Sequence, residues 1–305
     1  MFLDKIVEAL GLVYREEWAL RGIFTHLGNM FTGFSIKGFF AGFMAVIELI
    51  GMLLFGLPVS PRGQELDLTG YELVLYDEFE GDTLDYDIWY HRGDGKQRDG
   101  YSNKSQVSLR DGNLVITGEY LDDGAYGPGW YAASVATNEW YVNGYFEIRC
   151  ICSDGANFWS AFWLQAHHPY EAEYSQGGVG GAELDIFECF SSPGQIFGGD
   201  CITSTIHCAG VDGIQEGFQS ANLGDFKGKN IHEEYNTYGL EWTEDEYIFY
   251  INGVETTRST FGNGVSKAEL NPIISMCVPD IQKFEGYGED YKTEFIVDYV
   301  KIYQK

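Results

Sequence analysis

The sequence predicts an all-β fold, a sandwich of many short strands, over residues 70–305. Short runs rich in β-branched and aromatic residues recur along this region, separated by turn signals such as Asn252-Gly253. Aromatic residues make up 16% of the chain and glycines number 39, a balance that suits strands and turns better than a helical bundle. One all-β domain often reaches about 200–250 residues, so residues 70–305 fit a single unit.

The N-terminal part, residues 1–57, follows a different pattern. Apolar residues at positions 3, 6, 7, 10, 13 and 14 repeat with a helical period, which predicts an amphipathic helix over residues 2–24. Residues 38–57 are then almost continuously apolar, interrupted only by Glu48 and ended by Pro58. We therefore expect a helical, hydrophobic segment before the β domain.

Residues 38–57 are long enough to cross a hydrocarbon core of about 30 Å. Glu48 opposes this, since an acid inside a membrane costs about 2.5–3.5 kcal/mol on insertion scales. A cleavable signal peptide fits poorly because the apolar run begins late. We expect a membrane anchor that leaves residues 70–305 outside the cytoplasm, because Lys and Arg precede the run. Helices packed on the β domain, or a segment lying on a membrane surface, remain alternatives.

Residues 58–69 are polar, contain Pro61 and Gly63, and are predicted to form a short linker. The strands expected after it are the following: 72–79, 114–118, 131–142, 144–152, 161–165, 202–208, 247–251, 272–277 and 294–303.

The formal charge of −27 lies almost entirely on the β domain. Residues 1–57 contain four Lys or Arg and five Asp or Glu, a net of −1, which leaves −26 for the rest. Such a surface repels nucleic acid and polyanionic polysaccharides, so a neutral glucan or galactan is favoured over a sulfated galactan as a partner. The sequence gives no sign of an oligomeric state.

Six cysteines occur, an even number that would allow disulfides in an exported domain. Cys150 and Cys152 are i, i+2 neighbours on a predicted strand, with Cα atoms about 6.6 Å apart, near the upper limit for a bridge. No Cys-x-x-Cys pair or metal-spaced His/Cys cluster is present. Free thiols and disulfides both stay open.

Three carboxylates interrupt an apolar run at Glu183, Asp185 and Glu188. On a strand, Glu183 and Asp185 project from one face, whereas Glu188 lies an odd number of residues from both and would point to the other. A β-bulge at Ile186 or Phe187 would return Glu188 to the face of the other two. The spacing therefore predicts a bulged strand with three acids on one surface.

Paired carboxyl groups about 5–5.5 Å apart are the equipment of a retaining glycosidase. Crowded like charges push one carboxyl toward its protonated form, which provides an acid near neutral pH. A solvated strand edge and a metal-binding acidic patch are the alternatives that these residues leave open.

The stretch Gly181 to Glu188 resembles the E-x-D-x-x-E signature of glycoside hydrolase family 16, in the bulged form of its laminarinase-like members. Further segments that resemble the family occur in its order over residues 70–304: 76–84 with Trp89, 111–116, 144–149, 158–164, 205–207, 238–242 with 251–253, and 297–303.

The resemblance implies a jelly-roll β-sandwich whose concave sheet forms the substrate cleft. It implies that Glu183 is the nucleophile, that Glu188 is the acid/base, and that Asp185 hydrogen-bonds the nucleophile. Sugar rings stack on aromatic faces. The substrate-binding residues that we expect are Trp159, Trp130, Tyr131 and His207.

The resemblance also implies a structural calcium ion on the face away from the cleft. Asp298 and the carbonyl of Gly112 match that pattern, and oxygen ligands suit calcium. The alternative is that Asp298 only caps the end of a strand and binds no metal. No cofactor is required for the chemistry itself.

Together these features predict a retaining endo-glycosidase that acts on a neutral β-linked polysaccharide, with β-1,3-glucan as the first choice. Mixed-linkage glucan and β-galactan are the alternatives with the same chemistry. The family pattern has an Arg where Val135 stands, which weakens any transfer of a particular sugar specificity. A carbohydrate-binding lectin of the same fold is the alternative from another class, but it would be expected to have lost Glu183 or Glu188.

Overall fold

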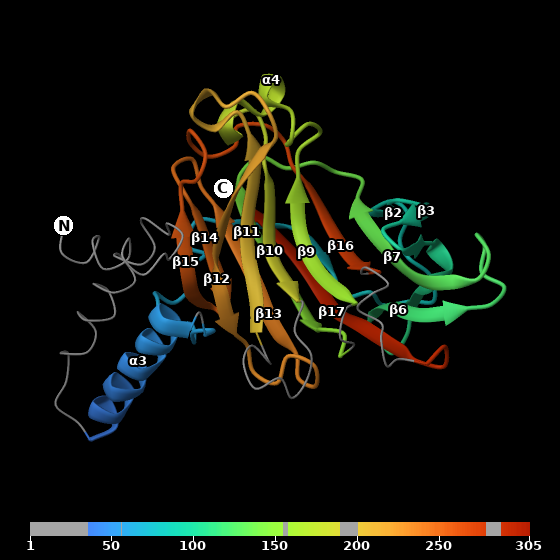
Figure 1. The fold of residues 1–305 in the computed structure, drawn as a ribbon, viewed down its shortest axis with the longest axis horizontal. Coiled ribbons are helices and arrows are strands. Elements are labelled where there is room, and N and C mark those ends of the chain that lie inside the picture. Colours follow the sequence, from blue (N-terminus) through green and yellow to red (C-terminus); the bar gives the residue numbers. More distant parts are fainter. Residues whose placement is uncertain (1–35, 56, 155–157, 190–200, 279–287) are drawn as a thin grey trace.

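The computed structural model describes residues 36–55, 57–154, 158–189, 201–278 and 288–305 (Figure 1). The amphipathic helix predicted over residues 2–24 lies outside the described residues. From residue 72 onward the described chain is built mainly of β-strands, as the sequence predicts. The strands form two antiparallel layers, with one parallel contact between β4 and β7.

The first layer, sheet A, carries the candidate site, and each of its strands pairs with the next. Figure 1 shows β9, β10, β11 and β12 side by side within it. Its strands, in spatial order, are β2 (Trp89–His91), β7 (Gly129–Thr137), β16 (Asn271–Cys277), β9 (Trp159–Gln165), β10 (Glu183–Cys189), β11 (Cys201–Ala209) and β12 (Phe218–Lys227).

The second layer, sheet B, is centred on the long strand β17 (Lys292–Gln304). Strand β8 lies along one side of β17, and β1 and β6 lie along the other. Its remaining strands are β15 (Val254–Ser259), β14 (Tyr247–Ile251), β13 (Asn236–Trp242), β8 (Gly144–Ile151), β1 (Glu72–Asp77), β6 (Leu114–Leu121), β5 (Val107–Leu109), β4 (Gly100–Ser102) and β3 (Gly95–Gln97).

Strand β7 belongs to both layers, which explains how the sandwich is joined at one end. Gly129 to Tyr131 pair with β6, whereas Ala133 to Ala136 pair with β16. A strand that changes sheets in this way is covered on both faces, and all residues from Trp130 to Thr137 are buried.

The main hydrophobic core lies between the two sheets. Phe187 of β10 stacks on Tyr238 of β13 with ring centroids 4.3 Å apart, and it also contacts Phe295 of β17. Because Phe187 is fully buried, its truncation to Ala would cost about 3–5 kcal/mol. This packing fixes the strand on which the three acids lie.

The predicted turn at Asn252-Gly253 is confirmed between β14 and β15. Asn252 has a φ of 50° and Gly253 a φ of 74°. Two successive residues in the left-handed region give the type of turn whose twist matches a β-hairpin.

The prediction of a linker over residues 58–69 is wrong. The backbone N–H of Val59 bonds to Asp225 of β12, and the N–H of Leu66 bonds to Gly253. Leu66, Leu68 and Tyr71 pack on a second, smaller cluster of three buried side chains on the outer face of sheet B: Tyr145, Ile248 and Tyr250. The segment is an extended arm fixed on the β domain, because its apolar residues pack on the outer face of sheet B.

Helix α3 (Ile36–Phe55) confirms that the apolar run is helical. Its Glu48 side chain accepts hydrogen bonds from the backbone and hydroxyl of Ser60 and from Arg62, and Lys227 Nζ lies 3.6 Å away. The acid at the middle of the helix is therefore bound to the arm and to sheet A.

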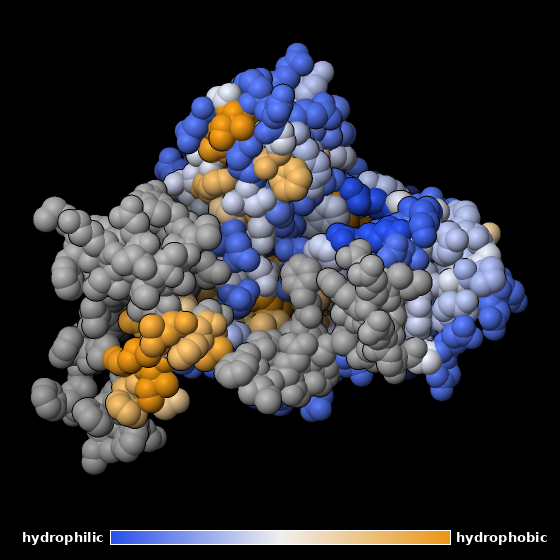
Figure 2. Space-filling view, viewed as in Figure 1, coloured by the Kyte–Doolittle hydropathy of each residue, from blue (hydrophilic) through white to orange (hydrophobic). Residues whose placement is uncertain are grey.

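A row of apolar side chains on α3 is exposed at Phe43, Ile47, Ile50 and Leu54, visible as an orange patch in Figure 2. Within the described residues, no helix combines the length and the apolar character needed to cross a membrane.

None of the six cysteines forms a disulfide in the structure. Cys150, Cys152 and Cys189 are buried in the core. This decides the question that the sequence left open in favour of thiols.

Candidate active site

The three acids lie on β10, and a β-bulge falls where the sequence predicts it. Asp185 pairs with Trp163 of β9, and the next paired residue of β10 is Phe187, opposite Phe162. Ile186 is therefore the extra residue. Its carbonyl oxygen accepts a hydrogen bond from the Ser204 hydroxyl at 2.9 Å, which satisfies a group that the bulge removes from the ladder.

The bulge brings Glu188 to the same face as Glu183 and Asp185. The three acids pair with Gln165, Trp163 and Ala161 of β9, positions that differ by two and so share one face. Their β11 partners, His207, Thr205 and Thr203, follow the same alternation. We call this surface, defined by Glu183, Asp185 and Glu188, the acidic face of sheet A.

Glu183 is held by two donors that bind the same oxygen. The hydroxyl of Tyr170 and the amide Nε2 of Gln165 both donate to Oε2. Gln165 is in turn positioned by Arg92, whose Nη2 donates to its Oε1 at 2.7 Å. The carboxylate is thus oriented by neighbours on β9 and on the loop that follows it.

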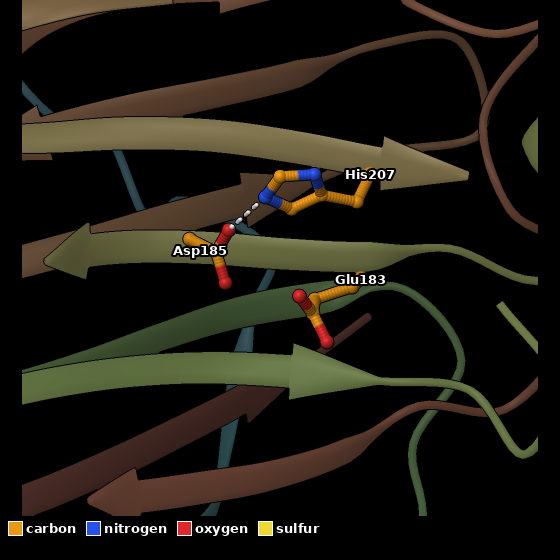
Figure 3. Close-up of side chains that lie close together, drawn as sticks. All are labelled: Glu183, Asp185 and His207. Carbon is orange, nitrogen blue, oxygen red and sulfur yellow. Dashed lines mark ion pairs between the residues drawn. The ribbon is translucent and has the colours of Figure 1, made fainter. Parts of the chain in front are cut away.

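Asp185 is almost completely buried, with 3% of its surface exposed, and lies beside His207. His207 Nε2 is 3.2 Å from Asp185 Oδ2, and Figure 3 shows the two side chains with Glu183 nearby. Burial, and then the charge of Glu183, raise the pKa of Asp185 well above its usual range. The Nδ1 atom of His207 contacts the Ser220 hydroxyl at 2.5 Å, which fixes the ring.

Glu188 has the environment of a carboxyl that stays protonated. It is 8% exposed, and burial together with the charge of Asp185 raises its pKa to about 9. The charge of His207 and a hydrogen bond with the Trp159 side chain act in the opposite direction. A protonated carboxyl at neutral pH is able to act as a general acid.

Trp159 and Trp163 of β9 are partly exposed on the acidic face, as their shared parity predicts. The Arg98 guanidinium carbon lies 4.2 Å from the ring centroid of Trp159, and that of Arg92 lies 4.8 Å from Trp163. Trp163 Nε1 donates to Ser275 at 3.0 Å. The two aromatic side chains are therefore fixed in orientation beside the acids.

Trp130 and Tyr131 do not lie on this surface. Tyr131 is fully buried and Trp130 is 6% exposed, with Trp130 packed against Tyr120 and Phe158. Neither ring offers a free face to a sugar, because β7 is covered on both sides. The expectation that they bind substrate is wrong for this structure.

The predicted calcium ligands do not fit a metal site either. The Asp298 carboxylate already forms an ion pair with Arg149, which neutralises the charge that a metal ligand would offer. Gly112 occupies a turn with a φ of 68°. Among the described residues, the three side chains that bring ligand atoms within 4.8 Å of one another are instead Glu183, Asp185 and His207.

That cluster satisfies the distance requirement for a metal, but its chemistry favours another role. Glu183 Oε2 is already bound by two donors, and Asp185 is buried with a raised pKa. A metal site requires ionised carboxylates that face the ion. The arrangement suits proton transfer and nucleophilic attack.

Sequence reasoning missed Gln165, Tyr170, Arg92 and Arg98. Gln165 shares parity with Trp159 and Trp163, so its position on the acidic face could have been found. The other three lie in loops or at a strand end, where no periodic pattern signals their direction.

A β-sandwich with three acids on one face of a bulged strand, two of them with a pKa raised by burial, is the construction of a glycoside hydrolase. The family model described as the GH16 domain of β-porphyranases A–D matches residues 74–304. The chain therefore belongs to glycoside hydrolase family 16.

Relatives and solved structures agree with this. Over 292 residues the chain is 24% identical to glucan endo-1,3-β-glucosidase A1 of Niallia circulans, covering 82% of this chain and 39% of that protein. It is 26% identical to glucan endo-1,3-β-glucosidase of Cryptopygus antarcticus, covering 74% and 89%. The structure of SCLam, a non-specific endo-β-1,3(4)-glucanase of family GH16, matches at a TM-score of 0.63 and 21% identity, covering 82% and 97%. The jelly-roll fold is thus established.

Proposed function

We propose that this chain is a retaining endo-glycosidase that hydrolyses a neutral β-linked polysaccharide, with β-1,3-glucan as the first choice. The observation that supports it most is the register of β10, which puts Glu183, Asp185 and Glu188 on one face. Two carboxyl groups that share a face, one ionised and one protonated, are what double displacement requires.

In this proposal Glu183 is the nucleophile and Glu188 the acid/base. Glu188, with its pKa raised to about 9, gives its proton to the glycosidic oxygen while Glu183 attacks the anomeric carbon. Water then releases the sugar and returns the proton to Glu188. Asp185 lies between the two along the strand. Its contact with His207 sets its ionisation, and so the negative charge next to Glu183 and Glu188.

The choice of β-1,3-glucan rests on relatives. Two of them are named glucan endo-1,3-β-glucosidases, and the matched structure is named an endo-β-1,3(4)-glucanase. Trp159 and Trp163 are partly exposed beside the acids and supply aromatic surface for the apolar side of a glucose unit. Mixed-linkage glucan is the closest alternative, since the name of the matched structure covers both linkages.

A β-galactan is the second candidate, and a specific observation favours it. The matching family model is that of the GH16 domain of β-porphyranases A–D. Arg92 and Arg98 lie over the two tryptophans of the acidic face. Guanidinium groups at this position would attract a substrate with an anionic substituent, although the overall charge of −27 opposes one.

The experiment is the release of reducing ends from laminarin, lichenan, galactan, agarose and porphyran. We expect hydrolysis of laminarin, and a loss of about 10²–10⁴-fold in Glu188→Gln from the missing proton transfer. Glu183→Gln should lose activity to a similar extent. Glu173→Gln, an exposed acid in the short helix α4 (Ala172–Ser175) between β9 and β10, is the matched control and should keep full activity.

Activity retained in Glu183→Gln or Glu188→Gln would contradict the assignment of roles. Binding of a glycan without release of reducing ends by the wild-type chain would instead favour the lectin alternative. Hydrolysis of porphyran or galactan but not laminarin would favour the second candidate.

We further propose that the enzyme acts outside the cytoplasm, because a polysaccharide is too large to enter a cell intact. Helix α3, with its exposed apolar row and its attachment through Glu48, would then lie against a membrane surface rather than cross it. Alkaline washing of membranes should release the full chain. Retention after such a wash would support a spanning anchor.

A further inference from the structure

Tyr170 contacts the proposed nucleophile, although no pattern in the sequence marks it. It lies in the loop between β9 and β10, and its hydroxyl donates to Glu183 Oε2. Gln165 Nε2 donates to the same oxygen and to the Tyr170 hydroxyl, at 3.2 Å for the latter. Both donors bind Oε2, so the oxygen they leave for a substrate is Oε1.

The loop around Tyr170 is fixed by hydrogen bonds to the rest of the fold. The buried Ser175 hydroxyl donates to the carbonyl of Gly181 at 2.8 Å and accepts from the N–H of Ala209 on β11 at 3.1 Å. Phe218 of β12 packs on the Tyr170 ring with centroids 5.2 Å apart. The hydroxyl is therefore held in position before any substrate binds.

The Tyr170 hydroxyl acts as a donor across the working pH range. Tyr170 keeps 42% of its surface exposed, but desolvation of its hydroxyl, followed by the charge of Glu183, raises its pKa above the ordinary value. Its proton accordingly stays on the phenol and points to the carboxylate.

We propose that Tyr170 is a positioning residue that directs Glu183 to attack through Oε1 and stabilises its carboxylate when the sugar leaves. This rests on the proposed function, with Glu183 as nucleophile. In the first step Oε1 bonds to the anomeric carbon, the glycosidic bond breaks, and the leaving oxygen takes the proton of Glu188. Oε2 is then the carbonyl oxygen of an ester.

In the second step water bonds to the anomeric carbon and gives its proton to Glu188. The bond to Oε1 breaks, and its electron pair returns to the Glu183 carboxylate. An ionised oxygen accepts a stronger hydrogen bond than an ester carbonyl. The Tyr170 hydrogen bond therefore strengthens during this step and lowers its barrier.

The test compares Tyr170→Phe with wild type on 4-nitrophenyl β-laminaritrioside. Since hydrogen bonds to charged groups contribute appreciably, kcat should fall roughly 10- to 100-fold. KM should fall with it because the glycosyl-enzyme accumulates. A burst of nitrophenol and a mass increase of one trisaccharide unit on the protein should appear. Loss of a merely structural contact would produce neither.

Tyr174→Phe is the matched control. Tyr174 lies in the short helix α4 that follows Tyr170, stacks on His168, and is 50% exposed. It should behave as wild type. An unchanged kcat in Tyr170→Phe, or a lower kcat with a higher KM and no burst, would overturn the inference while leaving the proposed function intact. Absence of hydrolysis by wild type and Tyr174→Phe on every glycan would contradict the proposed function itself.

Discussion

The imidazole Nε2 of His207 lies 3.2 Å from the buried Oδ2 of Asp185. The two residues come from neighbouring strands, β11 and β10, and His207 pairs across the ladder with Glu183. A group that is able to hold positive charge thus lies among three crowded carboxyls. The ionisation of the site depends on both strands.

The first prediction concerns the pH profile of kcat/KM. Glu188 must be protonated to act as an acid, and its pKa is raised to about 9, so activity should fall as pH rises through about 9. The charge of His207 lowers that pKa. His207→Gln removes that charge, so the alkaline limb should not move to lower pH.

Exposed His168, which pairs with Glu171, supplies the control for this measurement. His168→Gln should leave the alkaline limb in place. A limb that moves downward in His207→Gln would contradict the electrostatic account.

The second prediction is that Glu188→Gln stabilises the fold. A carboxyl whose folded pKa is raised from 4.5 to about 9 weakens the fold increasingly as pH rises between these values. At pH 7 the variant should be more stable by about 3 kcal/mol, given about 1.36 kcal/mol per pKa unit. Gln keeps an oxygen that can accept from Trp159.

Thermal unfolding at two pH values checks it. The melting temperature of the variant should exceed that of wild type by several degrees at pH 7, and the two should agree at pH 4. A variant less stable than wild type at pH 7 would show that Glu188 is held as a carboxylate.

The third prediction concerns the attachment of α3. Burial acts to raise the pKa of Glu48, but hydrogen bonds from Arg62 and Ser60 and the charge of Lys227 outweigh it and lower the pKa. The stability from these contacts is present above the usual Glu pKa and is lost as pH falls through the lowered value. Glu48→Gln should cost about 1 kcal/mol, or about 2–4 °C, at pH 7 and less in acid.

For Glu48, the matched control is Glu65→Gln, an exposed acid on the arm, which should melt as wild type does. Equal melting temperatures of Glu48→Gln and wild type at pH 7 would mean that the helix is not bound through this side chain.

The fourth prediction is that chelation leaves stability unchanged. Because the Asp298 carboxylate is paired with Arg149, excess EDTA should not shift the melting temperature. A drop of several degrees, reversed by Ca²⁺, would restore the calcium site that the sequence suggested.

The sequence predicts the bulge because Glu188 lies an odd number of residues from Glu183 and Asp185. In a regular strand it would point into the apolar core, so an extra residue must intervene. Ile186 fills the extra position, and the parity of Trp159 and Trp163 places both on the acidic face. Periodicity of two is a local property, so it is readable without coordinates.

Contacts between distant parts of the chain are not readable in this way. The polar arm at residues 58–69 has the composition of a linker, yet Leu66 bonds to Gly253 far along the chain. Trp130 and Tyr131 look like stacking residues, but β7 passes between sheets and buries them. Tyr170 reaches Glu183 only through the conformation of its loop.

The most direct test of the central claim is the configuration of the first product, followed by proton NMR during hydrolysis of laminarin. A nucleophile at Glu183 and an acid/base at Glu188 on the same face predict that the β-anomer appears first, with the α-anomer growing later by mutarotation. If the α-anomer appeared first, the enzyme would be inverting and Glu183 would not be the nucleophile.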